Sequence, residues 1–242
     1  MIKNKNREDR FNSENSNAYD ELINIIIPGY QRSHELAQYL LEDSLQNSSK
    51  ILIAGCGTGK EIIDFSKNNL HWQFLGFDPS EKMLQMAKEK LQINNCLERA
   101  RLIRGVIDDV IETEFDAATA ILILQFLHSN EEIQRFITSI STKLKPEAPL
   151  ILVYMEGSKE TNEYSVLNSA WMTQQFRTRN DDQAVIDEFK RRDEEIKFIA
   201  QELIESYLDK AGFSKPIKFY QAYLLTGLIA FKKRINIGTC GG

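Results

Sequence analysis

The chain has 242 residues, of which 42% are apolar and 27% are charged, a composition typical of one globular α/β domain with an insertion. Its net charge of −5 argues against a large polyanionic partner, and no apolar run is long enough to span a bilayer. No signal peptide is found before the first expected helix, and the three cysteines are too widely separated to predict a metal site or a disulfide framework. We therefore expect a cytoplasmic, reduced protein with no bound metal and no membrane partner.

The N-terminal part of the chain predicts a tail and two helices. Residues 1–15 are polar and rich in asparagine, which favours disorder. The apolar pattern then predicts one helix from Ala18 to Ile27 and another from about Gln31 to Leu45, with Pro28-Gly29 between them. Tyr30 lies at the connection between the two helices, where it either covers a bound ligand or packs between the helices and holds them together.

A strand, a tight turn and the start of a helix follow between residues 51 and 65. Ile51 to Ala54 are apolar in succession, which is typical of a strand buried on both faces. The turn that follows consists of Gly55, Cys56, Gly57, Thr58 and Gly59. Its glycines allow positive φ and a close approach of the backbone to a ligand, and the helix N-terminus offers unpaired N–H groups.

The spacing of this turn separates it from two other Gly-rich motifs. A dinucleotide fingerprint reads G-x-G-x-x-G, whereas the third glycine here comes one residue earlier. A phosphate-binding P-loop has Ser or Thr after its lysine to hold magnesium, whereas Glu61 follows Lys60. A plain strand-to-helix turn without a ligand is the alternative interpretation.

The next strand is expected over residues 71–77 and ends at Asp78. An acidic residue about twenty positions after a Gly-rich turn, at the carboxyl end of the second strand, is placed to accept hydrogen bonds from a ribose diol. Asp78-Pro79-Ser80-Glu81 also fits a capping box with proline at the first helical position, and both roles can hold together. The order of strand, turn, helix, strand and acid predicts a nucleoside-binding site.

The region after Asp78 predicts the adenine end of such a site. A helix is expected from Ser80 to about Gln92, and Met83 on its apolar face either packs in the core or touches the adenosine. A third strand over residues 101–105 is followed by Val106, Ile107, Asp108 and Asp109. An apolar side chain there can cover the ring and an aspartate can accept from its exocyclic amine, with a solvated turn as the alternative for each aspartate.

The fourth strand, expected over residues 115–124, is long and apolar. Gln125, Phe126, Leu127 and His128 follow at its carboxyl end, the edge where ligands bind in open α/β sheets. His128 is the best-placed candidate for a general base, and a histidine facing water at the start of the next helix is the alternative. Tyr154 and Glu156, after a fifth strand from Pro149 to Tyr154, are further candidates.

The stretch from Met155 to about Leu208 is helical and charged, and it is expected to form a lid over a substrate pocket. Its aromatic residues either line that pocket or form a small core within the lid. These residues are Tyr164, Trp171, Phe176 and Phe189. Residues 217–220 and 224–232 then predict a closing antiparallel pair of strands.

Together these elements predict a Rossmann-like, doubly wound α/β sheet that is mostly parallel with an antiparallel last strand, with N-terminal helices and a helical lid insertion. We expect a single domain over residues 16–234, with tails over residues 1–15 and 235–242. Its parts are the N-terminal helices (16–48), the cofactor-binding core (49–155), the helical lid (156–210) and the closing strands (211–234).

With these residues in place, the chain resembles the class I (Rossmann-like) S-adenosylmethionine-dependent methyltransferases over almost its whole length. Within them it is most similar to the carboxy-S-adenosyl-L-methionine synthase branch, which acts in the 5-oxyacetate modification of wobble uridine in tRNA. The local matches are Pro28-Gly29-Tyr30, Leu124-Gln125-Phe126-Leu127, Tyr164-Ser165 and Ala211-Gly212-Phe213.

The sequence also departs from that branch. Val106 stands where the branch has an aspartate after the glycine of the third strand, and Ile121 stands where it has an asparagine. Both changes remove polar contacts with the cofactor. Lys60 follows the glycine turn, and Pro146-Glu147-Ala148 replaces the usual Pro-Gly-Gly. The branch is expected to hold the extra carboxylate of its cofactor with a lid arginine, for which Arg191 or Arg192 is the counterpart.

The resemblance implies S-adenosyl-L-methionine as the cofactor, and no metal. The implied cofactor-binding residues are Tyr30, Gly55, Cys56, Gly57, Gly59, Asp78, Pro79, Met83, Val106, Ile107, Asp108, Leu124 and Gln125. The implied substrate-binding residues are Tyr30, His128, Tyr154, Tyr164, Trp171 and Arg191, with His128 as the catalytic candidate.

Three functions fit these expectations. The first is a methyltransferase that acts on a small-molecule acceptor, in which the protein mainly positions the acceptor and excludes water. The second is a carboxy-S-adenosylmethionine synthase-like enzyme with a role in tRNA modification, so that tRNA is a partner only in this case. The third is a non-catalytic module that binds S-adenosylmethionine. A homodimer is also expected, and the sequence does not name the acceptor.

Overall fold

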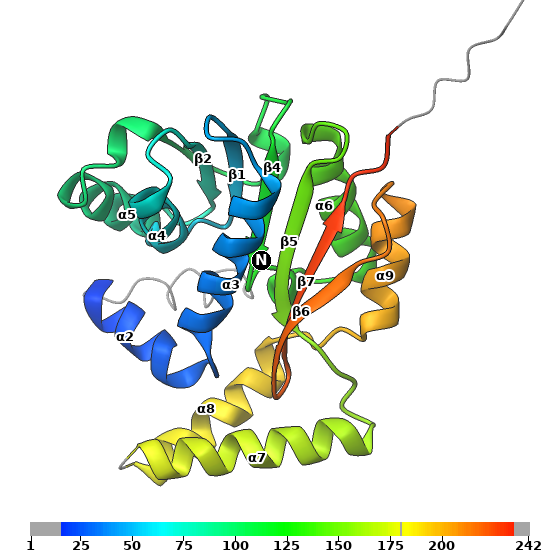
Figure 1. Ribbon diagram of the computed structural model, residues 1–242. Coiled ribbons are helices and arrows are strands. Elements are labelled where there is room, and N and C mark those ends of the chain that lie inside the picture. Colours follow the sequence, from blue (N-terminus) through cyan, green and yellow to red (C-terminus); the bar gives the residue numbers. More distant parts are fainter. Residues whose placement is uncertain (1–15, 180, 235–242) are drawn as a thin grey trace, which may run out of the picture.

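The computed structural model describes residues 16–179 and 181–234, and its centre is a seven-stranded sheet with the order β3-β2-β1-β4-β5-β7-β6 (Figure 1). The strands are β1 (Lys50–Ala54), β2 (Gln73–Asp78), β3 (Ala100–Arg104), β4 (Ala117–Ile121), β5 (Pro149–Met155), β6 (Ile217–Ala222) and β7 (Leu225–Phe231). The first five strands pair in parallel, and β7 runs antiparallel to its neighbours β5 and β6. The predicted Rossmann-like fold with an antiparallel last strand is confirmed.

The central strands form because their apolar runs are covered on both faces. Every residue of β4 and β5 is buried, as expected for parallel strands with helices above and below them. One face is covered by α6 (Asn130–Lys143) and α9 (Gln201–Lys210), and the other by α3 (Tyr30–Ser44) and α4 (Lys60–Asn68). The helix α5 (Glu81–Ile93) lies beside α4, next to β2 and β3.

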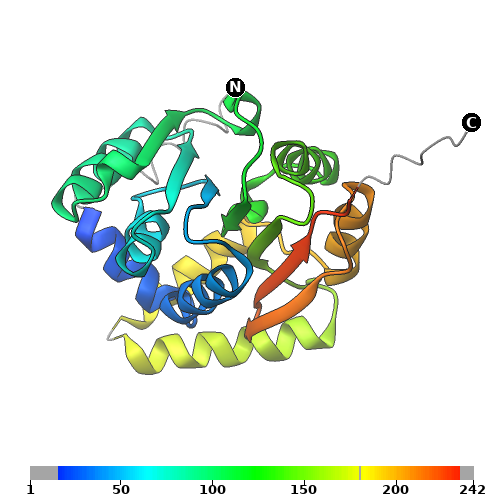
Figure 2. The same cartoon turned by 45° about the horizontal axis from the view of Figure 1, so that its top comes forward.

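Three further helices lie beyond the carboxyl ends of the parallel strands (Figures 1 and 2). They are α2 (Ser16–Ile26), α7 (Asn162–Thr178) and α8 (Asp182–Glu195). The indole Nε1 of Trp171 on α7 donates to the carbonyl oxygen of Ile26 at 3.0 Å, and the amide Nε2 of Gln175 donates to that of Ile25 at 3.0 Å. These bonds join the N-terminal helices to the lid, so both enclose the same end of the sheet.

The structure differs from the sequence expectations at two places. The fourth strand ends at Ile121, three residues before the predicted end, because Leu122 has a φ of 59° and leaves the extended conformation. Three short helices lie in the connections between elements: η1 (Leu97–Arg99), η2 (Ile107–Asp109) and η3 (Leu124–Phe126). Helix α9, expected within the lid, packs beside α6 instead, where the hydroxyl of Ser141 donates to the carbonyl oxygen of Ala211 at 2.7 Å.

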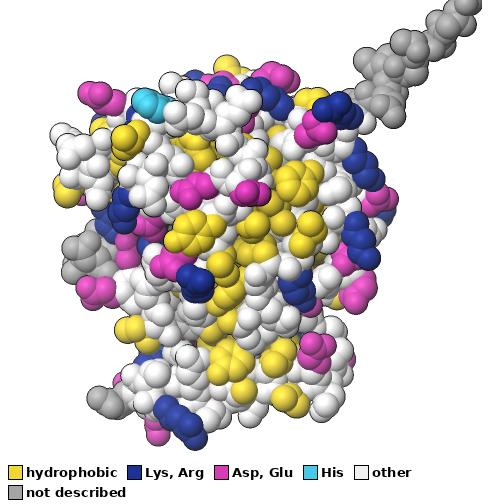
Figure 3. Space-filling view, viewed as in Figure 1, with side chains coloured by type: hydrophobic (Ala, Val, Ile, Leu, Met, Phe, Trp, Pro, Cys, Tyr) yellow, Lys and Arg dark blue, Asp and Glu magenta, His cyan; other side chains and the backbone are white. Residues whose placement is uncertain are grey.

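The surface seen in the orientation of Figure 1 mixes charges of both signs around a group of apolar side chains (Figure 3). Exposed apolar residues of the described part of the chain include Tyr39 and Ile217. Within that part, no helix combines the length and the apolar character needed to cross a bilayer. The predicted tails, residues 1–15 and 235–242, lie outside the described residues.

Candidate functional site

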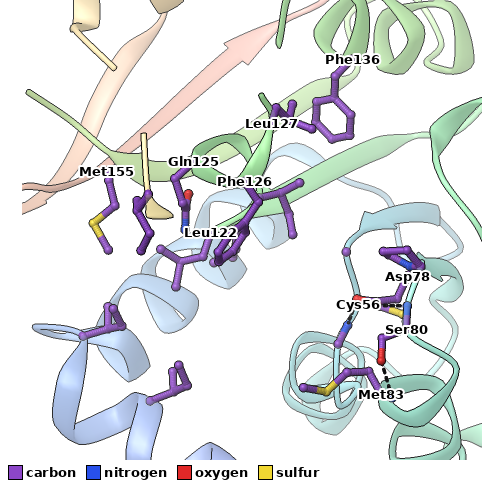
Figure 4. Close-up of a pocket in the computed structure, with 18 of the residues that line it drawn as sticks. Cys56, Asp78, Ser80, Met83, Leu122, Gln125, Phe126, Leu127, Phe136 and Met155 are labelled. Atoms are coloured by element: carbon purple, nitrogen blue, oxygen red, sulfur yellow. Dashed lines mark hydrogen bonds between the residues drawn. The ribbon is translucent and has the colours of Figure 1, made fainter. Parts of the chain in front are cut away.

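A cavity of about 540 Å³ lies at the carboxyl ends of β1, β2 and β4, enclosed by α2, α3 and the lid. It is lined on one side by the glycine turn and by residues that follow β2 and β3, and on the other by residues that follow β4 and β5. Figure 4 shows Cys56, Asp78, Ser80 and Met83 on the first side, and Leu122, Gln125, Phe126 and Met155 on the second. Both the nucleoside site and the substrate pocket are predicted from the sequence at this edge of the sheet.

The glycine turn after β1 has the conformation that only glycine adopts without strain. The φ angles of Gly55, Gly57 and Gly59 are 66°, 50° and 80°. A Cβ atom at Gly55 would lie 2.0 Å from Cδ1 of Ile123, a residue that itself lines the cavity. Gly59 is different, because it does not line the cavity, and a Cβ atom there would lie 3.2 Å from the Cβ of Ala87 on α5.

Asp78 ends β2 and joins the glycine turn to the start of α5. Its Oδ2 accepts from the backbone N–H of Gly57 at 3.0 Å, and its Oδ1 accepts from that of Ser80 at 2.9 Å. The side chain lines the cavity, and burial raises the pKa of its carboxyl group while the two N–H donors oppose that shift. The N-cap of α5 is Ser80, whose hydroxyl accepts from the N–H of Met83, so Asp78 supports the helix start without being its cap.

The side of the cavity that is expected to contact adenine, after β3, is formed by η2. Val106, Ile107 and Asp108 all line the cavity, together with Met83 from α5. The two aspartates have separate roles, because Asp109 Oδ2 accepts from the N–H of Val106 at 2.8 Å and closes the turn. Asp108 is therefore the aspartate that faces the cavity.

The opposite wall is mostly apolar and contains one unsatisfied polar group. Phe126, Leu127, Phe136 and Met155 line it. Gln125 is only 2% exposed, and its Oε1 atom is buried without a hydrogen-bond partner among the described residues. A bound ligand with an N–H or O–H group would satisfy that oxygen.

The lid contributes an arginine surrounded by aromatic rings. The guanidinium carbon of Arg192 lies 4.3 Å from the ring centroid of Phe189 and 4.7 Å from that of Trp171. Its Nη2 donates to Asn168 and to Asp193, but its Nη1 is buried without a partner among the described residues. Arg191 also lines the cavity but is exposed.

Besides Gly59, four of the expected site residues do not line the cavity. His128 is exposed, because η3 directs the three residues before it inward and Ser129 then begins α6. Leu124 is fully buried in the core between the sheet and α6. Tyr154 is fully buried there too, which raises the pKa of its phenol. Tyr164 is buried within the lid, on α7, and donates to Asp193 Oδ1 at 3.1 Å.

Two buried titratable residues of the cavity were not identified from the sequence. His34 on α3 bonds through Nδ1 to the carbonyl oxygen of Tyr30 at 2.8 Å, and burial lowers its pKa to about 4. Glu61 on α4 accepts from the hydroxyl of Thr119 on β4 at 2.7 Å, and burial raises its pKa to about 7. The sequence contains one signal for these residues, which is their position in the helical repeat, because each lies on the inward, apolar face of its helix.

Comparison with known proteins identifies the region that contains the glycine turn, Asp78 and η2. Residues 51–147 match the family model described as "Methyltransferase domain". This part of the chain is thus similar to a methyltransferase domain. The resemblance to class I methyltransferases inferred from the sequence is confirmed.

Among curated proteins, the chain is similar to carboxy-S-adenosyl-L-methionine synthases. Synthase 1 of Yersinia pseudotuberculosis serotype IB is 30% identical over 154 residues, which cover 61% of this chain and 62% of the relative. The synthase of Campylobacter hominis is 27% identical over 145 residues, 59% of each chain. The synthase of Desulfotalea psychrophila is 21% identical over 230 residues, 92% of this chain and 91% of the relative. The first matches thus span less than two thirds of their relatives.

Among solved structures, the similarity lies in the fold. Magnesium protoporphyrin IX methyltransferase from Synechocystis, with bound SAH, superposes with a TM-score of 0.69 at 16% identity, covering 95% of this chain and 100% of that one. The N,N-8-amino-8-demethyl-D-riboflavin dimethyltransferase of Streptomyces davawensis gives a TM-score of 0.58 at 15% identity, covering 82% and 53%.

Proposed function

We propose that this chain binds S-adenosyl-L-methionine and transfers its methyl group to a small-molecule acceptor. The observation that carries the proposal is the bond between Asp78 and the N–H of Gly57, which links the glycine turn to the end of β2 in the wall of one cavity. This is the arrangement that a nucleoside requires, with a close backbone on one side and a carboxylate for the ribose diol on the other.

The residues of the cavity fit this cofactor from end to end. Asp78 would bind the ribose, Asp108 and the apolar side chains of Val106 and Ile107 would bind the adenine, and the glycine turn would lie along the amino-acid end. When bound, the cofactor supplies a sulfonium methyl group that is electrophilic without further activation.

The rest of the cavity suits an acceptor of modest size. The whole cavity, cofactor part included, has a volume of about 540 Å³, within the usual range for small-molecule sites. The wall formed by Phe126, Leu127 and Met155 would exclude water from the methyl group. Gln125 Oε1, which lacks a partner among the described residues, would orient an acceptor that carries a hydrogen-bond donor. Both structural relatives named above have small molecules in their printed names.

A general base is required only if the acceptor loses a proton during attack. His34 replaces His128 as the histidine that lines the cavity, and its lowered pKa keeps the ring neutral near pH 7. A cytoplasmic location, expected from the composition, is part of the proposal, and the homodimer expected from the sequence stays a prediction.

The test of this function is binding followed by product analysis. Titration with S-adenosylmethionine and S-adenosylhomocysteine is expected to give saturable binding at one site per chain. Incubation with S-adenosylmethionine carrying a labelled methyl group, together with fractions of a metabolite extract, is expected to yield a labelled small molecule. Absence of binding by both compounds would overturn the proposal.

A second candidate function is the synthesis of a carboxylated S-adenosylmethionine for tRNA modification. The curated relatives carry that name, and the unpartnered Nη1 of Arg192 in the cavity wall suits a ligand with an additional carboxylate. Ile121 and Val106, which line the cavity in place of the polar residues of that branch, argue for the first candidate. The mass of the nucleoside retained by the purified protein separates the two.

A further inference from the structure

Glu61 is a buried carboxyl group in the wall of the cavity, and the mechanism above does not use it. It is the second residue of α4 and is only 6% exposed. Thr119 Oγ1 donates to its Oε1 at 2.7 Å. Among the described residues, no ion pair joins it to a cation, since the adjacent Lys60 pairs with Asp64 Oδ2 at 2.6 Å.

A buried carboxyl group without a cation is costly to ionise. Burial accordingly raises the pKa of Glu61 to about 7, although the hydrogen bond from Thr119 favours the charged form. The position at the start of α4 also favours a negative charge, because the backbone N–H groups of the first turn are there. A cation brought by a ligand would complete this arrangement.

The sheet order shows which part of the ligand reaches Glu61. Asp78, at the end of β2, marks the ribose position. Strand β1 separates β2 from β4, and Glu61 is bonded to Thr119 on β4, on the other side of the glycine turn from Asp78. A nucleoside held by Asp78 therefore extends its 5′ substituent toward Glu61.

In S-adenosylmethionine that substituent carries two cationic groups. The sulfonium has no hydrogen to donate, whereas the α-ammonium has three N–H donors that match a carboxylate. We propose that Glu61 binds the α-ammonium group of the cofactor's amino-acid end, and that Thr119 holds its carboxyl group in place. This inference rests on the function proposed above.

Two ligands that differ in the amino-acid end test it. S-adenosylhomocysteine carries the α-ammonium, and 5′-methylthioadenosine has the same nucleoside and thioether without the amino acid. Glu61→Gln keeps the volume of the side chain and a carbonyl oxygen that accepts from Thr119. The variant is expected to bind S-adenosylhomocysteine about tenfold to a hundredfold more weakly, while its affinity for methylthioadenosine stays within about twofold.

A matched control removes a carboxylate elsewhere. Asp116 precedes β4 at the opposite end of the sheet, where its Oδ1 pairs with Lys145 Nζ at 2.6 Å, and it does not line the cavity. Asp116→Asn is expected to bind both ligands as the wild type does. If Glu61→Gln does not fold, the test is made on the wild type with S-adenosylhomocysteine and its analogue without the α-amino group. The wild type is expected to bind S-adenosylhomocysteine at least about tenfold more tightly than this analogue.

The outcomes separate this inference from the proposed function. Unchanged affinity of Glu61→Gln for S-adenosylhomocysteine, or an equal loss for both ligands, would overturn the role of Glu61 and leave the methyltransferase proposal standing. Equal binding of S-adenosylhomocysteine and its analogue without the α-amino group by the wild type would also overturn the role of Glu61. A wild-type protein that binds neither nucleoside would overturn the proposed function and this inference with it.

Discussion

The carboxylate of Asp78 accepts a hydrogen bond from the backbone N–H of Gly57 at 3.0 Å, although Asp78 ends β2 and Gly57 lies in the turn after β1. Its other oxygen accepts from the N–H of Ser80 at 2.9 Å, so the side chain is held from two directions. The glycine turn and the end of β2 are thereby fixed relative to each other before any ligand binds. Such preorganisation lowers the entropic cost of binding a nucleoside.

Replacing Asp78 by alanine is expected to weaken nucleoside binding irrespective of the amino-acid end. The variant loses the acceptor for the ribose diol and the bond to Gly57, and hydrogen bonds to charged groups contribute about 1.5–3 kcal/mol each. We expect the affinities for S-adenosylhomocysteine and methylthioadenosine to fall together by at least about tenfold in calorimetric titrations. Wild-type affinity for methylthioadenosine in the variant would show that Asp78 does not hold the ribose.

The first two glycines of the turn are expected to differ in their tolerance of alanine. Gly55→Ala combines positive φ with a Cβ atom 2.0 Å from Cδ1 of Ile123, whereas a Cβ atom at Gly57 has no neighbour closer than 4.0 Å. Gly57→Ala should cost only the backbone strain of about 1–2 kcal/mol, and Gly55→Ala should cost more. Urea denaturation of both variants measures the difference. Equal losses would contradict the packing described for Gly55.

Stability is expected to depend on pH through Glu61 and His34 with opposite signs. The pKa of Glu61 is raised from 4.5 to about 7, so its contribution is complete below pH 4.5 and is lost as the pH rises through 7. The pKa of His34 is lowered from 6.5 to about 4, so its contribution is complete above pH 6.5 and is lost as the pH falls through 4. In the pH range between these pKa values, the two residues change the free energy of unfolding with pH in opposite directions.

Glu61→Gln separates the two contributions in the ligand-free protein. The variant removes the loss of stability at high pH, so its free energy of unfolding relative to the wild type should rise between pH 4 and pH 8 by roughly 1–3 kcal/mol. Its remaining decline below pH 6.5 should come from His34. Urea denaturation across this range is the measurement, and a difference between variant and wild type that is the same at every pH would count against the buried, ionisable Glu61.

Arg192 and the adjacent Arg191 offer a matched pair for the second candidate function. Arg192 is buried among aromatic rings and has an unpartnered Nη1 among the described residues, whereas Arg191 is exposed. If a carboxylated S-adenosylmethionine is the true ligand, Arg192→Lys should weaken its binding at least about tenfold and leave S-adenosylmethionine binding nearly unchanged. Arg191→Lys should change neither affinity. If Arg192→Lys weakens the binding of both ligands to the same extent, Arg192 does not form a carboxylate site.

The local motifs of the site could be predicted from the sequence because their function is encoded in short spacings. The glycine turn, Asp78 and the residues from Val106 to Asp108 all line the same cavity, apart from Gly59. Parallel strands bring the ends of β1, β2 and β3 to one edge, so the order of the elements was sufficient to bring these residues together.

The rest of the site depends on tertiary packing that no short pattern specifies. Leu122 ends β4 early, and the resulting phase of η3 turns Gln125 inward and leaves His128 exposed. The helical phase of Glu61 indicates only that it faces inward, and its place in the site follows from the contact with Thr119 on β4. Both arginines line the cavity, but the rotation of α8 buries Arg192 and leaves Arg191 exposed. The charged sequence of α8 does not determine that rotation.

Binding of S-adenosylmethionine in the cavity is tested most directly by mass spectrometry of the nucleoside retained by the purified protein, with added S-adenosylmethionine as a competitor. We expect retained S-adenosylmethionine or S-adenosylhomocysteine in the wild type and a marked loss of both in Asp78→Ala. A retained species heavier by a carboxyl group would favour the second candidate function. A protein that retains no adenosine-containing compound and does not take up added S-adenosylmethionine would contradict the central claim.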